Sequence, residues 1–256
     1  MKLTFIGACH EVTGSCFLLQ HDGLNILIDS GMKQGASDLV SAPLPINEWE
    51  IDYIFLTHAH IDHSGNIPYL YKKGFRGKVI CTIGTKELSN IMLKDSAYIQ
   101  MSDAAWINKH NERSGKEKVE PLYTIEDVEN VLKRFEAYDY QDIISISDNI
   151  SIVFQDAGHL LGSASIIVML GTKSDYTSIV FSGDIGNENQ PLIKNPSNII
   201  SQVDYVVMES TYGNRVHEKP KDYISLLASI IQKTFDRGGD LIIPSFAVGR
   251  AQELLY

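Results

Sequence analysis

The stretch 51–65, IDYIFLTHAHIDHSG, decides how we interpret the chain, because an apolar run ends there in four potential metal ligands. These ligands are His58, His60, Asp62 and His63. The residues just before them are aromatic and β-branched over a short run, which predicts a buried strand. The sequence therefore places the four side chains on a loop anchored by a strand, where functional sites are often built.

The spacing of these residues indicates what the loop can bind. Just past a strand, residues i and i+2 project to the same side, so His58 and His60 can hold one ion together. Asp62 and His63 then turn toward a neighbouring position. Imidazole and carboxylate ligands suit zinc, and two ions about 3.5–4 Å apart form a common hydrolytic site. The alternative is a surface loop that happens to hold histidines, and the HxHxDH order makes the metal site the better interpretation.

Composition indicates a folded protein of one large domain or two modest ones, since 44% of its 256 residues are hydrophobic. No apolar run approaches the roughly 20 residues that span a bilayer, and the N-terminus turns polar too early for a secretory signal. Cys9, Cys16 and Cys81 include no CxxC pair, so we expect reduced thiols packed in the core. These features predict a cytoplasmic protein without a membrane partner.

The net charge is −10 and the sequence pI is near 5.2. Nucleic-acid binders usually present a basic surface, so this charge argues against a polyanionic partner. Bound metal ions would offset part of the charge, and a few arginines can hold a phosphate chain on an acidic protein. The net charge therefore lowers the expectation of a nucleic-acid partner without excluding it.

The order of strands and helices predicts an α/β fold. Residues 2–31 predict an antiparallel meander of three strands, followed by a polar connector at 36–50. Residues 78–85, KVICTIGT, predict a further strand.

A helix is expected from Thr85 to Met101, with Thr85 as its N-cap. The charged run Ser102–Val119 is expected to be an exposed insertion, and Thr124–Arg134 a capped helix. The apolar positions of the first helix are Leu88, Ile91, Met92, Tyr98 and Ile99.

Three later strands also end in polar residues. ISIVFQDAG leads to His159, TSIVFSGDIG carries Asp184, and DYVVMESTYGNR carries Glu209. Strand ends gathered on one rim of a sheet are where convergent polar side chains make a site. Asp29 ends an earlier strand, where a turn-forming role and a supporting role behind a metal ligand are equally open.

The last part of the chain predicts one helix at 222–237 and then, in LIIPSFAVGRAQELLY at 241–256, a strand, a loop and the first turns of another helix.

The order HAHIDH, GH in GHLLGSA and GD in FSGDIG resembles the metallo-β-lactamase superfamily. ESTYGNR and IIPSFAVGRAQELLY resemble its β-CASP branch, which comprises RNA and DNA nucleases such as ribonuclease J. The branch also includes the nuclease subunit of the eukaryotic cleavage and polyadenylation factor and its prokaryotic homologues, which this chain resembles most.

The resemblance implies a four-layer αββα sandwich with metals at the rim of two sheets. It implies that residues 1–210 form the metallo-β-lactamase domain without its C-terminal return segment, and that 211–256 begin a truncated β-CASP domain. The return segment would carry a late histidine ligand, so the second metal site is expected to be incomplete here and the chain itself can be inactive.

The resemblance also assigns the site residues. It implies one zinc held by His58, His60 and His159, and a second held by Asp62 and His63. Asp184 would bridge the two ions, Asp29 would support the ligands, and Glu209 would be the acidic residue that works beside a later histidine.

The expected function is zinc-dependent cleavage of phosphodiester bonds by a metal-activated hydroxide, with single-stranded RNA as the favoured substrate. Asp62 would orient the attacking water, and Glu209 would assist protonation of the leaving group. Arg215 and Arg250 are candidate phosphate contacts, although surface arginines often serve only solubility. One alternative is a small-molecule hydrolase of the same superfamily acting on a thioester, lactone or lactam. Another is a non-catalytic scaffold of an RNA-processing complex, and a homodimer is a candidate assembly.

Overall fold

The computed structural model describes residues 1–35, 43–172, 175–198, 202–216 and 222–256. Of the connector predicted at 36–50, residues 36–42 lie outside these ranges. The chain divides into two compact units, Met1–Glu209 and Ser210–Tyr256, and each is described by itself.

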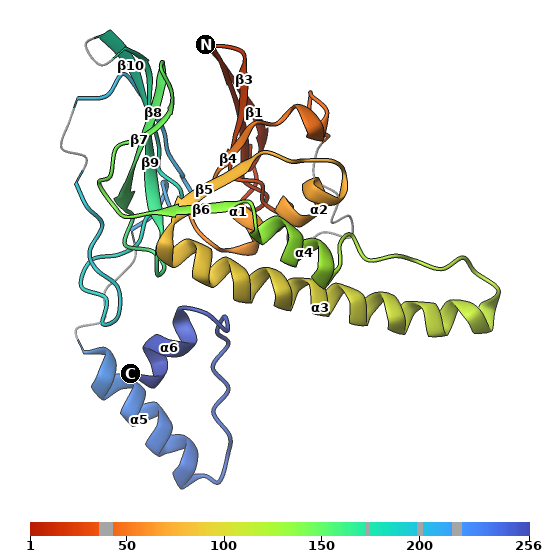
Figure 1. Cartoon of the computed structure of the whole chain (residues 1–256). Helices are drawn as coiled ribbons and strands as arrows, with labels where there is room; N and C mark the ends of the chain where they lie inside the picture. The colour runs from red at the N-terminus through yellow and green to blue at the C-terminus, as the bar shows by residue number, and fades with distance from the viewer. Residues whose placement is uncertain (36–42, 173–174, 199–201, 217–221) are drawn as a thin grey trace. The chain divides into compact units, whose positions relative to one another are not determined.

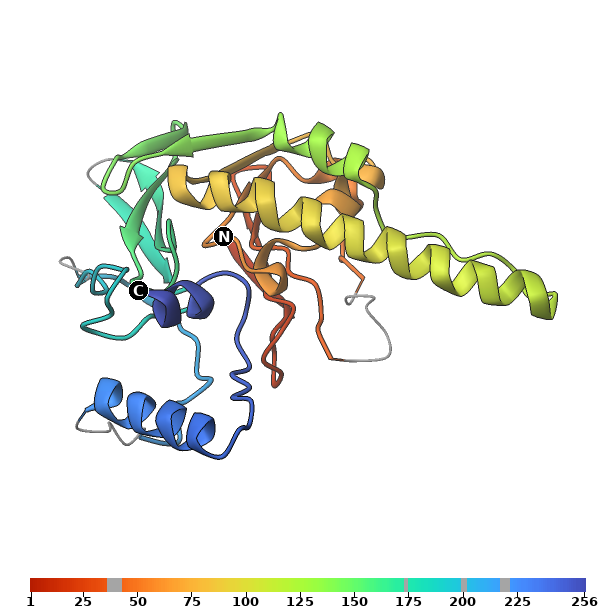
Figure 2. The same ribbon diagram turned by 90° about the horizontal axis from the view of Figure 1, so that it is seen from below.

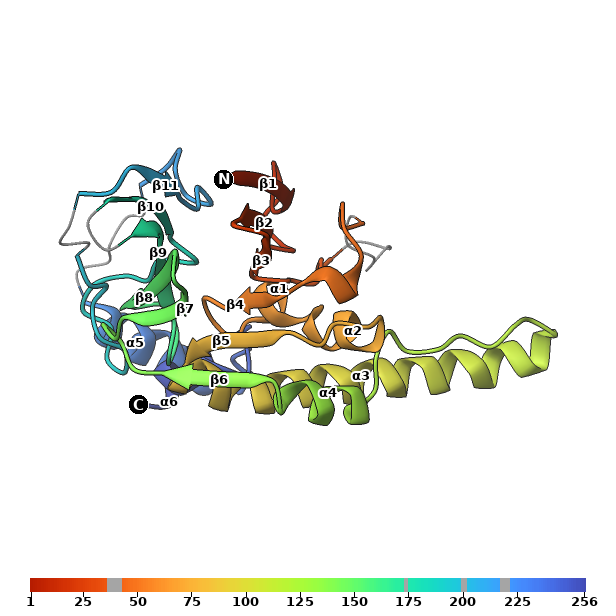
Figure 3. The same ribbon diagram turned by 45° about the horizontal axis from the view of Figure 1, so that its top comes forward.

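The first unit contains two β-sheets, whose strands can be followed in Figures 1 and 3. The first sheet begins with the predicted antiparallel meander and continues with parallel pairing from β3 to β6, in the order β1-β2-β3-β4-β5-β6. Its strands are β1 (Lys2–Gly7), β2 (Cys16–His21), β3 (Leu24–Ile28), β4 (Tyr53–Phe55), β5 (Lys78–Thr82) and β6 (Phe135–Tyr138).

The second sheet has the order β11-β10-β9-β8-β7. It is antiparallel from β7 to β10, and β11 joins β10 in parallel. Its strands are β7 (Ile144–Ser147), β8 (Ile150–Asp156), β9 (Ala164–Thr172), β10 (Asp175–Phe181) and β11 (Tyr205–Val207).

The two sheets pack face to face, and the alternation of side chains along each strand decides which layer each residue joins. In β3, Ile26 and Ile28 belong to the core between the sheets, whereas Leu27 faces the helices. Phe55 and Phe154 meet in the same inter-sheet core from opposite sheets. The inner strands β4 and β5 are mostly apolar on both faces because both of their faces are covered.

The helices of this unit pack on the outer face of the first sheet through Leu70, Leu93 and Val128. Stacked sheets with a helical cover confirm the predicted mixed α/β sandwich. The helical elements of this unit are η1 (Glu48–Glu50), α1 (Ile61–Ser64), α2 (Ile67–Lys72), α3 (Ile83–Ser114) and α4 (Ile125–Leu132).

Helix α3 differs from the prediction at both ends. It starts at Ile83, because the hydroxyl of Thr82 rather than Thr85 caps it by accepting the backbone N–H of Thr85. It continues to Ser114 and ends at Gly115, which has a left-handed backbone. The predicted insertion is therefore helical up to Ser114, and Figures 1 and 2 show this half projecting beyond the sheets.

The apolar positions named for this helix do not make up its buried face. Ile91, Tyr98 and Ile99 are exposed, whereas the buried side chains on the inner face include polar and small ones. A helix with apolar residues on both faces gives no single stripe from which the inward side could be predicted. The buried residues of α3 are Thr85, Ser89, Leu93, Ala97 and Ala104.

Three smaller differences concern strands and cysteines. Strands β6 and β7 were not predicted, and the residues from Leu241 to Pro244 do not form the predicted strand. A strand needs a neighbour for its backbone hydrogen bonds, which sequence cannot show and which this stretch lacks among the described residues. All three cysteines are free as predicted, but Cys9 is exposed rather than packed in the core.

The second unit contains α5 (Tyr223–Asp236), capped by Asp222, and α6 (Arg250–Leu255). The boundary between the units lies close to the predicted domain boundary at 210/211, and the identity of the two domains stays a prediction. Within the described ranges, no helix combines the length and the apolar character that crossing a membrane requires.

Candidate metal centre

The histidine-rich motif follows β4 at the rim of the first sheet. The backbone leaves the strand at Phe55, bends at Thr57, and enters α1 with His60 as its N-cap. His63 lies within α1 rather than on a loop, and its side chain is buried. The short helix therefore fixes the second half of the motif more rigidly than a loop would.

Three histidine nitrogens converge on one point. His58 Nε2 lies 3.0 Å from His60 Nδ1, and His159 Nε2 lies 3.2 Å from the same His60 atom. Asp184 Oδ2 is 3.7 Å from His58 Nε2 and 3.5 Å from His159 Nε2. One ligand atom from each of the four residues lies within 4.8 Å of all the others. The structure thus brings together residues that the chain separates by more than a hundred positions.

A second position begins on the other side of Asp184. Its Oδ1 lies 3.2 Å from His63 Nε2, while its Oδ2 faces the first group. His63 Nδ1 donates to Asp29 Oδ2 over 2.7 Å. This arrangement leaves each oxygen of Asp184 pointing to a different set of histidines, as expected of a bridging carboxylate.

Asp29 and Thr57 fix the proton positions of two of the rings. Asp29 accepts from the Thr57 backbone N–H at 2.8 Å and from the Thr57 hydroxyl at 2.9 Å. Because the single hydroxyl proton goes to Asp29, Thr57 Oγ1 must accept from His58 Nδ1, which lies 3.0 Å away. His58 therefore carries its proton on Nδ1 and presents a bare Nε2 to the centre. His63 donates its Nδ1–H to Asp29 and faces Asp184 with Nε2. Asp29 lies in a turn with a φ of 58°, and its carboxylate also holds Thr57 and His63 in place behind the cluster.

Burial keeps the three rings of the first group neutral. It is the main cause that lowers the pKa of His58 well below its ordinary value and the pKa of His60 to about 4, and nearby imidazoles add to both effects. Burial also lowers the pKa of His159 against the opposing charge of Asp184. Neutral imidazole is the form that binds a metal ion.

His63 and Asp184 form the charged side of the cluster. Burial alone lowers the pKa of His63, but the carboxylates of Asp29 and Asp184 outweigh it and hold that pKa well above its usual range. Burial raises the pKa of Asp184, but the hydrogen bond from His63 and the charges of the histidines outweigh it and lower that pKa. A metal at the second position would therefore replace a proton on His63.

The donor set of the first group fits a divalent metal ion. His60 Nδ1 lies within hydrogen-bond distance of both His58 Nε2 and His159 Nε2, and a neutral ring has only one N–H, so protons cannot join both pairs through His60. His58 already uses its own N–H on Thr57. A cation at the meeting point would satisfy the remaining lone pairs, and three nitrogens with one carboxylate oxygen are typical ligands of zinc.

Two further predicted site residues, Asp62 and Glu209, lie at the edge of the cluster. Asp62 is half-buried and near enough to His63 and Asp184 for their charges to act on it, although burial is the main cause that raises its pKa. Glu209 Oε1 accepts the backbone N–H of Ile185 at 2.9 Å, directly after Asp184. The structure thus brings Asp62 and Glu209 next to the cluster.

Arg215 and Arg250 belong to the second unit and are exposed. Arg250 Nη1 pairs with Glu253 Oε2 at 2.7 Å, and the Arg215 guanidinium lies 5.4 Å from the centre of the Tyr212 ring. Their role as phosphate contacts stays a prediction.

Sequence reasoning missed Thr57 and Gly183. A Cβ on Gly183 would lie 2.9 Å from the Thr57 Cβ, and its φ is 55°, so glycine is needed where β10 delivers Asp184 next to β4. The available signal for Thr57 was a hydroxyl side chain directly before the HxH motif, after the apolar run.

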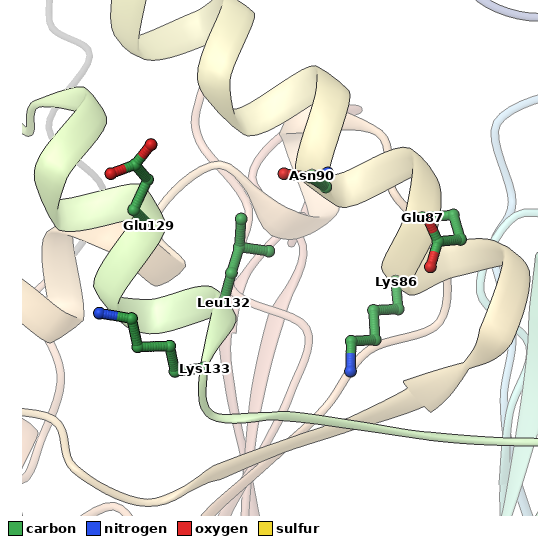
Figure 4. A pocket seen from close by; sticks show the side chains of 6 residues that line it. All are labelled: Lys86, Glu87, Asn90, Glu129, Leu132 and Lys133. Carbon is green, nitrogen blue, oxygen red and sulfur yellow. The ribbon is translucent and has the colours of Figure 1, made fainter.

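A shallow cavity of about 280 Å³ lies between α3 and α4, away from the histidines (Figure 4). The Lys86 ammonium donates to the Phe135 carbonyl and the Lys133 ammonium to Asn130, so both charges are already engaged. We assign it no function. Its lining is Lys86, Glu87, Asn90, Glu129, Leu132 and Lys133.

Comparison with known proteins agrees with this geometry. Ribonuclease TTHA0252 of Thermus thermophilus is 35% identical over 257 residues, covering 100% of this chain and 54% of that protein. Transcription termination factor FttA of Methanosarcina mazei is 35% identical over 263 residues, covering 100% of this chain and 38% of that protein. Cleavage and polyadenylation specificity factor 73 of Drosophila melanogaster is 32% identical over 259 residues, covering 100% of this chain and 35% of that protein.

The chain thus spans about half, or less, of the length of these curated relatives. Their names agree with the β-CASP branch that ESTYGNR indicated. The profile of the metallo-beta-lactamase superfamily matches residues 11–198, which include all the histidines of the cluster and Asp184. Because this match covers most of the residues, and the predicted ligands meet at one rim of the two sheets, the chain belongs to the metallo-beta-lactamase superfamily.

Proposed function

We propose that this chain is the metal-binding part of a zinc-dependent hydrolase that cleaves phosphodiester bonds, with single-stranded RNA as its substrate. The observation that carries the proposal is the convergence of His58 Nε2, His60 Nδ1 and His159 Nε2 beside Asp184. Relatives named as a ribonuclease and as a cleavage and polyadenylation factor support nucleic acid over a small molecule.

Two zinc ions are the proposed cofactor. His58, His60 and His159 would hold the first, Asp62 and His63 would hold the second, and Asp184 would bridge them. When bound, such a pair supplies a water whose pKa is lowered toward about 7 and a positive charge opposite the phosphate.

Asp62 is assigned to the attacking water. Burial raises the pKa of its carboxyl, which makes it a better proton acceptor than an exposed aspartate. From its place beside His63 and Asp184, its carboxylate would accept a hydrogen bond from the water and orient a lone pair toward the phosphorus.

Glu209 is assigned to the leaving group. Its carboxylate is held by the Ile185 N–H, and its own N–H donates to Ser182 Oγ at 3.0 Å, so two hydrogen bonds fix it beside Asp184. We propose that it orients a histidine from a later part of the protein, which protonates the departing oxygen. Arg215 and Arg250 are proposed to contact phosphates of the RNA.

A reducing compartment such as the cytoplasm fits the three free cysteines. The cytoplasm remains the proposed location.

The test combines zinc content with cleavage in the full-length protein that contains this chain. Zinc would be measured by mass spectrometry, and cleavage on end-labelled single-stranded RNA and DNA, a thioester and a lactone. We expect RNA cleavage that depends on zinc and disappears in His58→Ala/His60→Ala. His110→Ala, which removes a histidine outside the cluster, is the matched control and should retain both.

Each other result would argue against the proposal in a different way. Ester hydrolysis without RNA cleavage would favour the small-molecule hydrolase. Absence of both zinc and cleavage would favour the non-catalytic scaffold.

A further inference from the structure

Helix α3 carries a second apolar face that the fold does not use. Leu93 and Ala97 are buried against the rest of the unit, whereas residues on the opposite side are open to solvent. We call this open face the outer stripe. Its members and exposed fractions are Ile91 (62%), Tyr98 (64%), Ile99 (50%) and Trp106 (69%).

The segment that follows α3 leaves the outer stripe open. The Asn108 side chain bonds the Val119 backbone through both its amide and its carbonyl, at 2.9 and 2.7 Å. Asn108 lies about 200° around the helix from Trp106, so the return segment is held on a different face. Trp106 stacks on His110, with ring centroids 5.7 Å apart. Exposed aromatic and aliphatic side chains in one stripe indicate an interaction surface.

The charges along the stripe are arranged symmetrically about Ser102. Asp95 lies seven residues before it and Lys109 seven residues after it, while Tyr98 and Trp106 lie four residues to either side. At about 100° per residue, these five positions share an arc of about 80°. Among the described residues, neither Asp95 nor Lys109 has an ion-pair partner.

We propose that the outer stripe is the interface of a homodimer in which two α3 helices pack antiparallel about a two-fold axis at Ser102. This axis brings Asp95 opposite the partner's Lys109 and Tyr98 opposite the partner's Trp106, and the second copy of each contact follows by symmetry. The small side chains of Ser102 and Ala105 let the helices approach at the crossing point.

A second copy suits the stripe better than RNA does. Asp95 would repel a phosphate chain, and Ile91 and Ile99 offer nothing to a base, whereas both signs of charge find partners in the dimer. The inference goes beyond the proposed nuclease activity and does not depend on it.

Sedimentation equilibrium on the whole chain tests the interface. A contact made by a single helix from each copy is expected to be smaller than a standard interface, so we expect a dissociation constant on the order of 10 µM. Trp106→Glu should raise it by about 100-fold or more, since the change occurs twice in each dimer. Ile143→Glu is the matched control, because Ile143 is 75% exposed and lies outside α3. A wild-type chain that stays monomeric at several hundred micromolar would overturn the proposal.

A charge exchange tests the antiparallel pairing. Asp95→Lys and Lys109→Asp should each weaken the dimer several-fold, and the double variant should restore it. Failure of restoration in a double variant with wild-type circular dichroism and melting temperature would refute this axis.

A cross-linking experiment locates the axis without depending on affinity. In a Cys9→Ser background, which removes the exposed native thiol, Ser102→Cys should form a disulfide-linked dimer in air. Ser114→Cys should not, because it lies about 18 Å along the helix from the axis. Cross-linking of Ser114→Cys as fast as Ser102→Cys would contradict the proposed packing.

Discussion

Replacing Asp29 by asparagine is expected to weaken metal binding at the position of His63 while preserving the fold. The amide oxygen can still accept the N–H and hydroxyl of Thr57, which now bond the carboxylate at 2.8–3.0 Å. The amide nitrogen would then face His63 Nδ1, where Asp29 Oδ2 now accepts over 2.7 Å.

The size of the effect follows from the tautomer of His63. An amide N–H donates to Nδ1, so the ring loses its Nδ1 proton and keeps the one on Nε2, the atom 3.2 Å from Asp184 that would bind the metal. The metal then has to displace that proton without help from a carboxylate behind the ring. Loss of such a supporting carboxylate typically lowers metal affinity 10- to 100-fold, or about 1.4–2.8 kcal/mol.

The assay is competition for zinc against a chromophoric chelator, with the two binding steps resolved by isothermal titration calorimetry. Asp204→Asn is the matched control, because Asp204 also accepts a backbone N–H and a hydroxyl, those of Ser178, at 2.8 and 2.9 Å. It should leave zinc affinity unchanged. An unchanged affinity in Asp29→Asn, or an equal loss in the control, would show that Asp29 does not support the metal position at His63.

Three further outcomes are expected. His58→Ala together with His60→Ala should abolish binding at the first position, and retained zinc stoichiometry would show that the ligands are assigned wrongly. Gly183→Ala should lower the free energy of unfolding by about 1–3 kcal/mol in urea titrations, because the new Cβ would press on Thr57 at a left-handed backbone position; an unchanged midpoint would contradict this. The hydrogen bonds that Asp204 accepts lower its pKa, so its stabilising contribution is complete above its unfolded pKa near 3.9 and is lost as pH falls. The gap in melting temperature between wild type and Asp204→Asn should therefore close between about pH 5 and pH 2, and a constant gap would count against it.

The strands that carry the site and the polar residues at their ends could be predicted, because both are visible in short stretches of sequence. Apolar runs ending in His58, His159, Asp184 and Glu209 showed both the strands and their polar ends. Parallel and hairpin connections bring such strand ends to one rim of the sheets. Clustering of these polar side chains could therefore be expected from the sequence without any knowledge of distances.

The parts that could not be predicted depend on contacts across the chain. The role of Thr57 follows from the approach of Asp29, 28 positions earlier, and no local pattern encodes that approach. On α3, Ile91 and Tyr98 have the composition of a buried face, but Leu93 is the residue that packs inward. Periodicity alone cannot choose between two apolar faces of one helix.

A crystal structure of the zinc-loaded protein, with anomalous diffraction recorded at the zinc edge, would locate the metal ions directly. We expect one anomalous peak within about 2.0–2.2 Å of His58 Nε2, His60 Nδ1 and His159 Nε2, and a second beside His63 Nε2, with Asp184 between them. Zinc bound elsewhere, or bound without Asp184, would contradict this expectation.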